Sequence, residues 1–233
     1  TFLYRYYYTS FRTFAYMEFR PTRFEVMPPV VKNLLIINAL VFFANIVLGK
    51  YGIDLSEHLA LYNWKSEKFK VWQLVTHLFM HGGNVSDPEG GFLHLFSNMF
   101  ALWMFGSVLE GYFGSKRFLT FYMVCGVGAA ILYLIVQTIN QSPIDQGCVG
   151  ASGAVFGILF GFGYLFPNTL LYLYFMFPVK AKYFIAFYAL FELYAGIKNS
   201  AGDNVAHFAH IGGMIVAFII IKIWNQTNRK TLY

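Results

Sequence analysis

One serine in the chain lies where a nucleophile could be held. Ser152 follows Gly150 and precedes Gly153, at the boundary between a polar stretch with proline and aspartate and a long apolar run. The glycines allow backbone to come close to a reacting group. A serine hydroxyl is a poor nucleophile until a base accepts its proton, and a neutral imidazole is the usual base. The segment therefore indicates a nucleophile whose base comes from elsewhere in the chain.

Two histidines near the C-terminus are the candidate bases. His207 and His210 lie three residues apart, so one helical face would carry both. Small residues surround His210 at helical spacing, at Ala206, Gly213 and Ala217. After Ser152, glycine recurs every fourth residue as a glycine strip, at Gly153, Gly157 and Gly161. Such small residues allow two helices to approach closely. The positions expected to support this packing are Gly150, Gly153, Gly157 and Gly213. We expect His210 to be the base, with His207 as the alternative.

Donors for an oxyanion are available in a third segment. His94 and Asn98 lie four residues apart, and with the backbone N–H of Ser152 they could stabilise negative charge on a carbonyl oxygen. No aspartate lies in an apolar run, so we expect packing to orient the imidazole and the site to be a serine–histidine dyad. Glu192 interrupts an apolar run and is assigned no chemistry: it is either a buried protonated acid or a polar tie between helices. Glu110 is expected to brace its adjacent loop through backbone N–H groups.

The composition places these residues in a membrane. Of the 233 residues 58% are hydrophobic and only 12% charged, about half the charge of a typical soluble domain. The net charge of +6 comes from basic residues between apolar runs, so we expect no nucleic-acid partner. The two cysteines form no disulfide framework. The chain is thus expected to be an all-α polytopic membrane protein.

Six apolar runs approach the ~20 residues needed to cross a bilayer. The expected spans cover residues 30–48, 92–113, 118–139, 152–166, 179–197 and 205–224. They lie between a cytoplasmic or interfacial leader, 1–27, and a short tail, 226–233, within a membrane domain of residues 28–225. The side that holds the leader has more Lys and Arg, so both termini are expected in the cytoplasm and the loop before Ser152 outside.

Two connecting segments carry further expectations. The long connection 49–91 has apolar clusters at 71–75 and 78–80 that favour short interfacial helices over free coil. The segment 169–177 lies between prolines, which favours an extended interfacial segment over a seventh helix.

Other chemistries are less favoured by the residues present. His77 and His81 could form a metal site with His94, but the chain has no H-E-x-x-H pattern, so loop-structuring roles are preferred. The four aspartates all fall in expected loops, which excludes a mechanism with two aspartates in spans. A transporter is disfavoured because no internal repeat is evident.

The chain resembles the rhomboid family of intramembrane serine proteases over residues 28–225. The resemblance rests on Gly150-Ala151-Ser152-Gly153, on His94-x-x-x-Asn98, and on Ala209-His210-x-Gly212-Gly213, in this order and each at an expected span. It implies a six-helix bundle, a catalytic Ser152 and His210, and an oxyanion site of His94, Asn98 and the Ser152 amide. It further implies cleavage of single-span transmembrane substrates near small residues, without cofactor or metal, and we expect the bacterial inner (plasma) membrane. The alternative is a non-catalytic relative that binds transmembrane segments.

Three positions depart from the family's pattern. Trp72 precedes Gln73 where many members have arginine, so the first loop must be ordered differently. Phe156 stands where some members stack a tyrosine on the catalytic imidazole, and it keeps the ring without the hydroxyl. The glycine-rich segment between His81 and His94 resembles an insertion.

Overall fold

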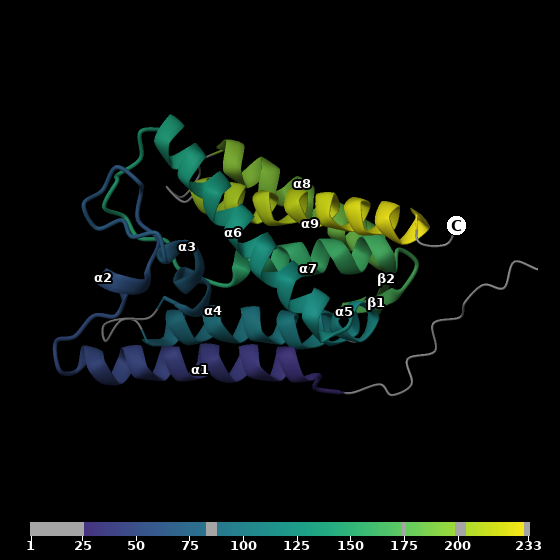
Figure 1. Ribbon diagram of the computed structural model, residues 1–233, viewed down its shortest axis with the longest axis horizontal. Helices are drawn as coiled ribbons and strands as arrows, with labels where there is room; N and C mark the ends of the chain where they lie inside the picture. Colours follow the sequence, from purple (N-terminus) through teal and green to yellow (C-terminus); the bar gives the residue numbers. More distant parts are fainter. Residues whose placement is uncertain (1–25, 83–87, 174–175, 199–203, 231–233) are drawn as a thin grey trace, which may run out of the picture.

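Figure 1 shows the computed structural model, which describes residues 26–82, 88–173, 176–198 and 204–230. In these ranges the chain is mostly helical. The elements in order are α1 (Pro29–Gly49), α2 (Ser56–Leu59), α3 (Gln73–Thr76), the 3₁₀ turn η1 (His77–Phe79), α4 (Pro88–Ala101), the π-helical turn η2 (Leu102–Gly106), α5 (Ser107–Phe113), α6 (Ser115–Ile139), α7 (Ser152–Leu165), β1 (Leu170–Leu173), β2 (Phe177–Lys180), α8 (Ala181–Lys198) and α9 (Asn204–Lys230). Apart from residues 26 and 27, the expected leader lies outside the described residues, as do 83–87 of the glycine-rich segment.

Four helical segments in the described part of the chain are long and apolar enough to cross a membrane. They are Pro29–Gly49, Glu89–Phe113, Ser115–Ile139 and His207–Gln226. Their outward faces carry exposed apolar side chains such as Leu40 and Phe43, 63% and 57% exposed. An apolar surface of this extent requires lipid contact, and the protein is a multi-pass integral membrane protein. The other two expected spans are α7, which is apolar but short, and α8, which also carries charged residues.

The short helix α7 occupies the centre of the bundle (Figure 1). Its side chains Ile158 and Phe162 pack into a core shared with Phe121 of α6 and Ile221 of α9. Glycines on α7 remove side-chain bulk where its neighbours approach, which allows backbone contact between helices. The bundle thereby holds the first residue of α7, Ser152, at a fixed position inside the protein.

The structure corrects several expected boundaries. The segment 169–177 is in part a strand, because β1 pairs antiparallel with β2, and residues 179 and 180 belong to β2 and not to the fifth span. Helix α8 therefore begins at Ala181. Helix α9 continues to Lys230, into the expected tail, because no proline or glycine interrupts the chain after Gly213. The fold is mostly helical rather than all-α.

The first loop folds against the nucleophile segment. Leu61 and Cys148 exchange two backbone hydrogen bonds of 2.9 and 2.8 Å, and Gly150 N–H donates to the His77 carbonyl oxygen. Short helices α2 and α3, with η1, form in this loop, the latter two at the apolar clusters near 71–75 and 78–80. Figure 1 places α2 and α3 at the opposite end of the molecule from the hairpin and the C-terminus.

Candidate active site

Ser152 is the first residue of α7, in a position suited to attack on a carbonyl. The first N–H groups of a helix have no acceptor within it, and the helix dipole favours negative charge there. Gly150 adopts φ of +128°, and a Cβ atom at this position would lie 2.9 Å from Cε1 of His94. A side chain there would meet both backbone strain and a clash. The expected role of Gly150 in helix packing is therefore wrong: it is a loop residue that lets the His94 ring approach.

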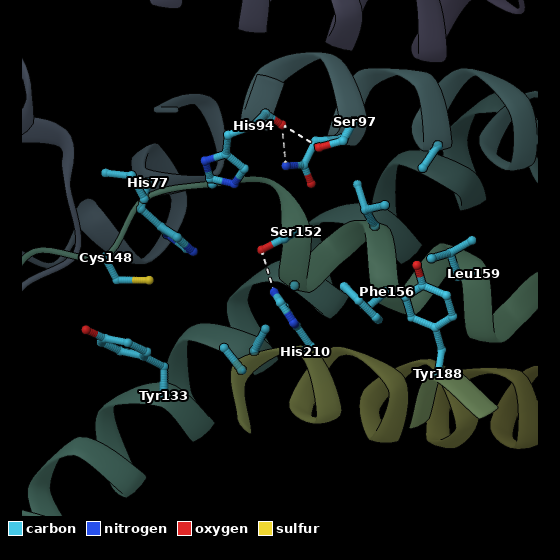
Figure 2. Close-up of a pocket in the computed structure, with 18 of the residues that line it drawn as sticks. His77, His94, Ser97, Tyr133, Cys148, Ser152, Phe156, Leu159, Tyr188 and His210 are labelled. Atoms are coloured by element: carbon cyan, nitrogen blue, oxygen red, sulfur yellow. Dashed lines mark hydrogen bonds between the residues drawn. The ribbon is translucent and has the colours of Figure 1, made fainter. Parts of the chain in front are cut away.

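The imidazole of His210 contacts the serine hydroxyl. Its Nε2 lies 2.9 Å from Oγ of Ser152, and Figure 2 shows the two side chains pointing toward each other. The ring of Phe156 stacks on the imidazole with centroids 4.1 Å apart and planes inclined by 13°. Ser152 and Phe156 lie four residues apart on α7, so one helix supplies both contacts.

The glycine strip of α7 faces two helices and not one. Gly213 of α9 packs on the carbonyl group of Gly153 so closely that a Cβ at Gly213 has no room. A Cβ at Gly157 would lie 2.8 Å from Cys125 of α6 and 3.1 Å from the Gly213 carbonyl oxygen. Gly161 faces Phe121 of α6. The expected approach of α7 and α9 is present at Gly153 and Gly213, but α6 fills much of the remaining strip.

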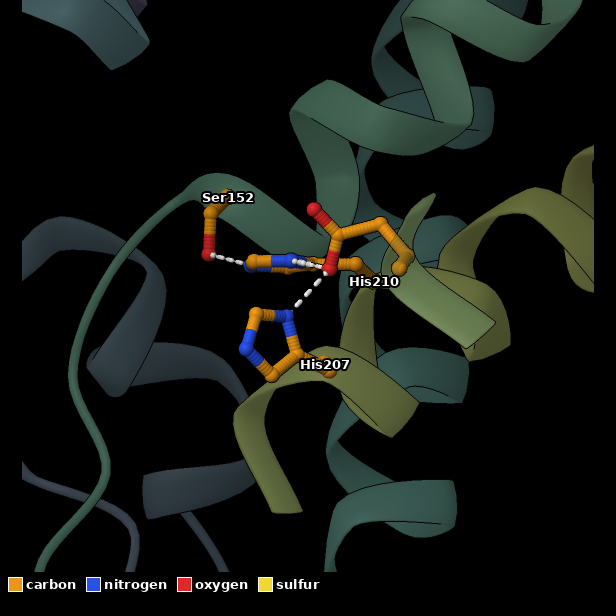
Figure 3. Close-up of polar contacts among 4 residues, drawn as sticks. Ser152, His207 and His210 are labelled. Carbon is orange, nitrogen blue, oxygen red and sulfur yellow. Dashed lines mark hydrogen bonds and ion pairs between the residues drawn. The ribbon is translucent and has the colours of Figure 1, made fainter. Parts of the chain in front are cut away.

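A buried carboxylate lies behind His210. Oε2 of Glu192, on α8, is 2.8 Å from Nδ1 of His210 and 2.7 Å from Nδ1 of His207 (Figure 3). The residue is only 4% exposed. Orientation of the His210 ring therefore does not come from packing alone, which corrects the expectation of a dyad without a third polar member. The sequence signal for this contact was the sole acid in the apolar run of α8.

His94 and Asn98 lie on α4 across the cavity from His210. Figure 2 shows the His94 ring on the opposite side of Ser152 from the His210 ring. The amide Nδ2 of Asn98 donates to the carbonyl oxygen of His94 at 2.9 Å, one turn back on the same helix. An amide nitrogen carries two hydrogens, so this bond leaves one for an oxyanion. Both side chains line the cavity that contains Ser152.

The cavity has a volume of about 770 Å³, within the range of a ligand site. Its polar side chains include Ser97 and Gln146 besides those just described. Its remaining wall is largely apolar and aromatic, with contributions from Met104, Phe105, Leu159, Phe184 and Tyr188. Such a wall suits an apolar ligand better than a charged one.

His77 and His81 are buried in the first loop. Nδ1 of His77 lies 2.8 Å from the carbonyl oxygen of Gln73, and the His81 ring packs edge to face on His94 at 5.2 Å. In the described ranges these three histidines do not form a three-ligand group. Ligand atoms of Glu192, His207 and His210 do lie within 4.8 Å of one another, close enough for a divalent ion.

Comparison with known proteins gives one consistent result. The family model described as the Rhomboid domain matches residues 68–226. RHOMBOID-like protein 12, mitochondrial, of Arabidopsis thaliana is 31% identical over 203 residues, covering 82% of this chain and 56% of the plant protein. The putative rhomboid protease YdcA of Bacillus subtilis is 29% identical over 198 residues, covering 83% and 89%. The rhomboid protease GlpG of Salmonella choleraesuis is 26% identical over 215 residues, covering 91% and 69%. The matched part of the yeast and plant relatives is a third to just over a half of their own length.

Proposed function

The chain belongs to the rhomboid family, and from this premise we propose that it is an intramembrane serine endopeptidase with Ser152 as nucleophile and His210 as base. The observation that carries the proposal is the 2.9 Å contact between Ser152 Oγ and His210 Nε2. A hydroxyl within hydrogen-bond reach of an imidazole nitrogen can lose its proton as it attacks.

The proposed reaction begins with attack of Ser152 Oγ on the scissile carbonyl carbon. The hydroxyl proton passes to Nε2 of His210, and the carbonyl oxygen becomes an oxyanion. The Ser152 backbone N–H, the His94 ring and the Asn98 amide are the proposed donors to this oxyanion. The His210 imidazolium then protonates the leaving amine, and the C–N bond breaks to give an acyl-enzyme. Water, deprotonated by His210, hydrolyses the ester and returns Ser152.

The proposed substrates are single-span transmembrane proteins, cleaved near small residues. The apolar and aromatic wall of the cavity supports this proposal because it can accept an unwound apolar segment. A helix must open before its backbone reaches a nucleophile, and small residues such as glycine and alanine leave room for close approach. No cofactor takes part in the proposed steps.

The proposed topology has six spans, with α7 and α8 added to the four long apolar segments. Both termini are proposed to lie in the cytoplasm, because Lys116 and Arg117 in the first turn of α6 and Lys222 in the C-terminal part of α9 add positive charge to that side. The proposed membrane is the bacterial inner membrane, on the strength of the Bacillus and Salmonella relatives. The yeast and Arabidopsis relatives are named as mitochondrial proteins, so fractionation of the source cells is the measurement that decides.

A reporter with one transmembrane helix that contains Ala and Gly near its outer end tests the function. The purified protein in vesicles should cleave it, and Ser152→Ala should reduce cleavage to background at unchanged expression. A fluorophosphonate should label Ser152, as located by peptide mass spectrometry. Ser97→Ala removes another serine of the same cavity and should still be labelled at Ser152. Undiminished cleavage by Ser152→Ala would overturn the proposal.

The alternative is a non-catalytic protein that binds transmembrane segments. The cavity is compatible with such a binding protein. The contact between Ser152 and His210 favours the protease, because binding alone does not require it. Capture of the reporter without cleavage or labelling would support it.

A further inference from the structure

Glu192 is a carboxylate shared by two histidines. It lies on α8, and its Oε2 contacts Nδ1 of both His210 and His207, which are one turn apart on α9. These imidazoles are the ion-pair partners that the structure gives to Glu192. A carboxylate that is 4% exposed is costly unless such partners satisfy it. The arrangement therefore needs an explanation beyond chance placement of an acid in an apolar helix.

We infer that Glu192 is a positioning residue for His210, so that Ser152, His210 and Glu192 form one hydrogen-bonded triad. The inference rests on the proposed function of Ser152 and His210. It adds a third member that the serine and histidine motifs do not contain, supplied by a helix that carries neither of them.

The geometry gives Glu192 two effects on His210. An ionised carboxylate only accepts hydrogen bonds, so contact with Nδ1 places the imidazole proton on that nitrogen and leaves the Nε2 lone pair for the Ser152 hydroxyl. When Nε2 takes the serine proton, the ring becomes positive beside a negative group in a protein interior, where opposite charges attract strongly. Both effects lower the barrier for attack without contact between Glu192 and substrate.

His207 has a different place in the same cluster. Its Nδ1 reaches Glu192, but its ring centroid is 6.3 Å from that of His210 and the ring planes are nearly perpendicular. Its side chain is also more exposed, at 27% against 18% for His210. His207 therefore holds the carboxylate in place from the rim of the site. Substitution of His207 should reduce activity less than substitution of Glu192.

Kinetics of fluorophosphonate labelling and of reporter cleavage test the inference. In Glu192→Gln, which keeps the shape and removes the charge, kcat should fall by at least about 100-fold while KM changes little. His207→Phe should lower labelling by less than about 10-fold, and Glu192→Asp should recover part of the activity.

A spectroscopic readout separates positioning from folding. With ¹⁵N-labelled histidine, wild type should give a strongly downfield Nδ1–H proton for His210, and Glu192→Gln should lose it at an unchanged unfolding midpoint. If the wild-type protein is active and Glu192→Gln keeps the wild-type kcat, the inference about Glu192 is wrong while the proposed function stands. The inference would also be wrong if kcat of Glu192→Gln fell only in proportion to a loss of folded protein. If the wild-type protein neither cleaves the reporter nor reacts with the fluorophosphonate, the proposed function is wrong. If the wild-type protein also lacks the downfield proton, the contact between Glu192 and His210 is absent too.

Discussion

The backbone N–H of Gly150 donates to the carbonyl oxygen of His77 at 2.9 Å, which joins the segment before Ser152 to the first loop. The paired hydrogen bonds of Leu61 and Cys148 lie a few residues earlier in the same segment. The loop between α1 and α4 therefore supports the start of α7. It follows that changes which loosen this loop should also slow reactions of Ser152.

Gln73 offers the first test of this coupling. It is fully buried; its Nε2 donates to the carbonyls of Lys68 and His58, and its Oε1 accepts from two backbone N–H groups. Gln73→Leu would remove the partner of the Tyr62 and Lys70 N–H groups and of the Lys68 carbonyl, whereas His58 keeps its bond from the Trp72 ring, at a cost of about 2–4 kcal/mol. We expect faster hydrogen exchange in residues 58–73 and slower fluorophosphonate labelling. Val71→Ala, at an adjacent exposed site, should change neither, and equal effects from both variants would contradict the prediction.

The buried histidines of the loop predict sensitivity to acid. Burial lowers the pKa of His77 from its ordinary 6.5 to about 4, and that of His81 to about 3. Below pH 6.5 the unfolded chain binds protons that the folded chain does not, so the free energy of unfolding falls as the pH drops from 6.5 toward 4. For His77 the loss is on the order of 3 kcal/mol.

Unfolding midpoints between about pH 7 and pH 4 measure this effect. His77→Gln should flatten the pH dependence. In the described part of the chain neither ring nitrogen of His81 has a hydrogen-bond partner, so His81→Leu should be tolerated and should also reduce acid sensitivity. A wild-type midpoint that is constant over this range would exclude the buried, neutral state of both rings.

Gly150 allows a local test at the nucleophile. Its φ of +128° and the short approach to His94 mean that Gly150→Ala should displace the His94 ring or the loop, at about 1–3 kcal/mol. We expect labelling of Ser152 to fall at least about tenfold while the bundle stays folded. Gly111→Ala is the matched control, because nothing lies within 4 Å of a Cβ there and its backbone is helical. Wild-type labelling in Gly150→Ala would show that the approach of His94 is not needed.

The fold was predictable where long apolar runs decide it. α1 and α6 follow their runs closely, since hydrocarbon requires helices of this length. The boundary near residue 179 was not, because pairing of β1 with β2 depends on contacts between segments rather than on composition. Glu110 shows the same limit. It was expected to brace the adjacent loop through backbone N–H groups. Its carboxylate does accept from the Ser115 hydroxyl there, but the backbone N–H groups that it binds are those of Val30 and Val31 at the start of α1.

The candidate site was predictable where a motif contains the residue. Ser152, His210, His94 and Asn98 all line one cavity. The contact of Glu192 with His210 could not be derived, because it depends on the relative depth and rotation of α8 and α9, which apolar periodicity does not define in a membrane. Only the cost of a lone acid in an apolar run marked Glu192 as unusual.

Gly157 tests how closely α7 must pack between its neighbours. Gly157→Leu would place a side chain against Cys125 of α6 and against the backbone of Gly213, and overpacking of this kind costs at least about 1–3 kcal/mol. Both stability and labelling of Ser152 should fall, since separation of α7 from α9 moves His210 away from the hydroxyl. Gly157→Ala should be milder, and Cys125→Gly in that background should restore part of the loss by making room on α6. Suppose that Gly157→Ala loses labelling and that the added Cys125→Gly restores stability but not labelling. The contact of residue 157 with Gly213 then determines the distance between Ser152 and His210. A fully active and stable leucine variant would refute this packing.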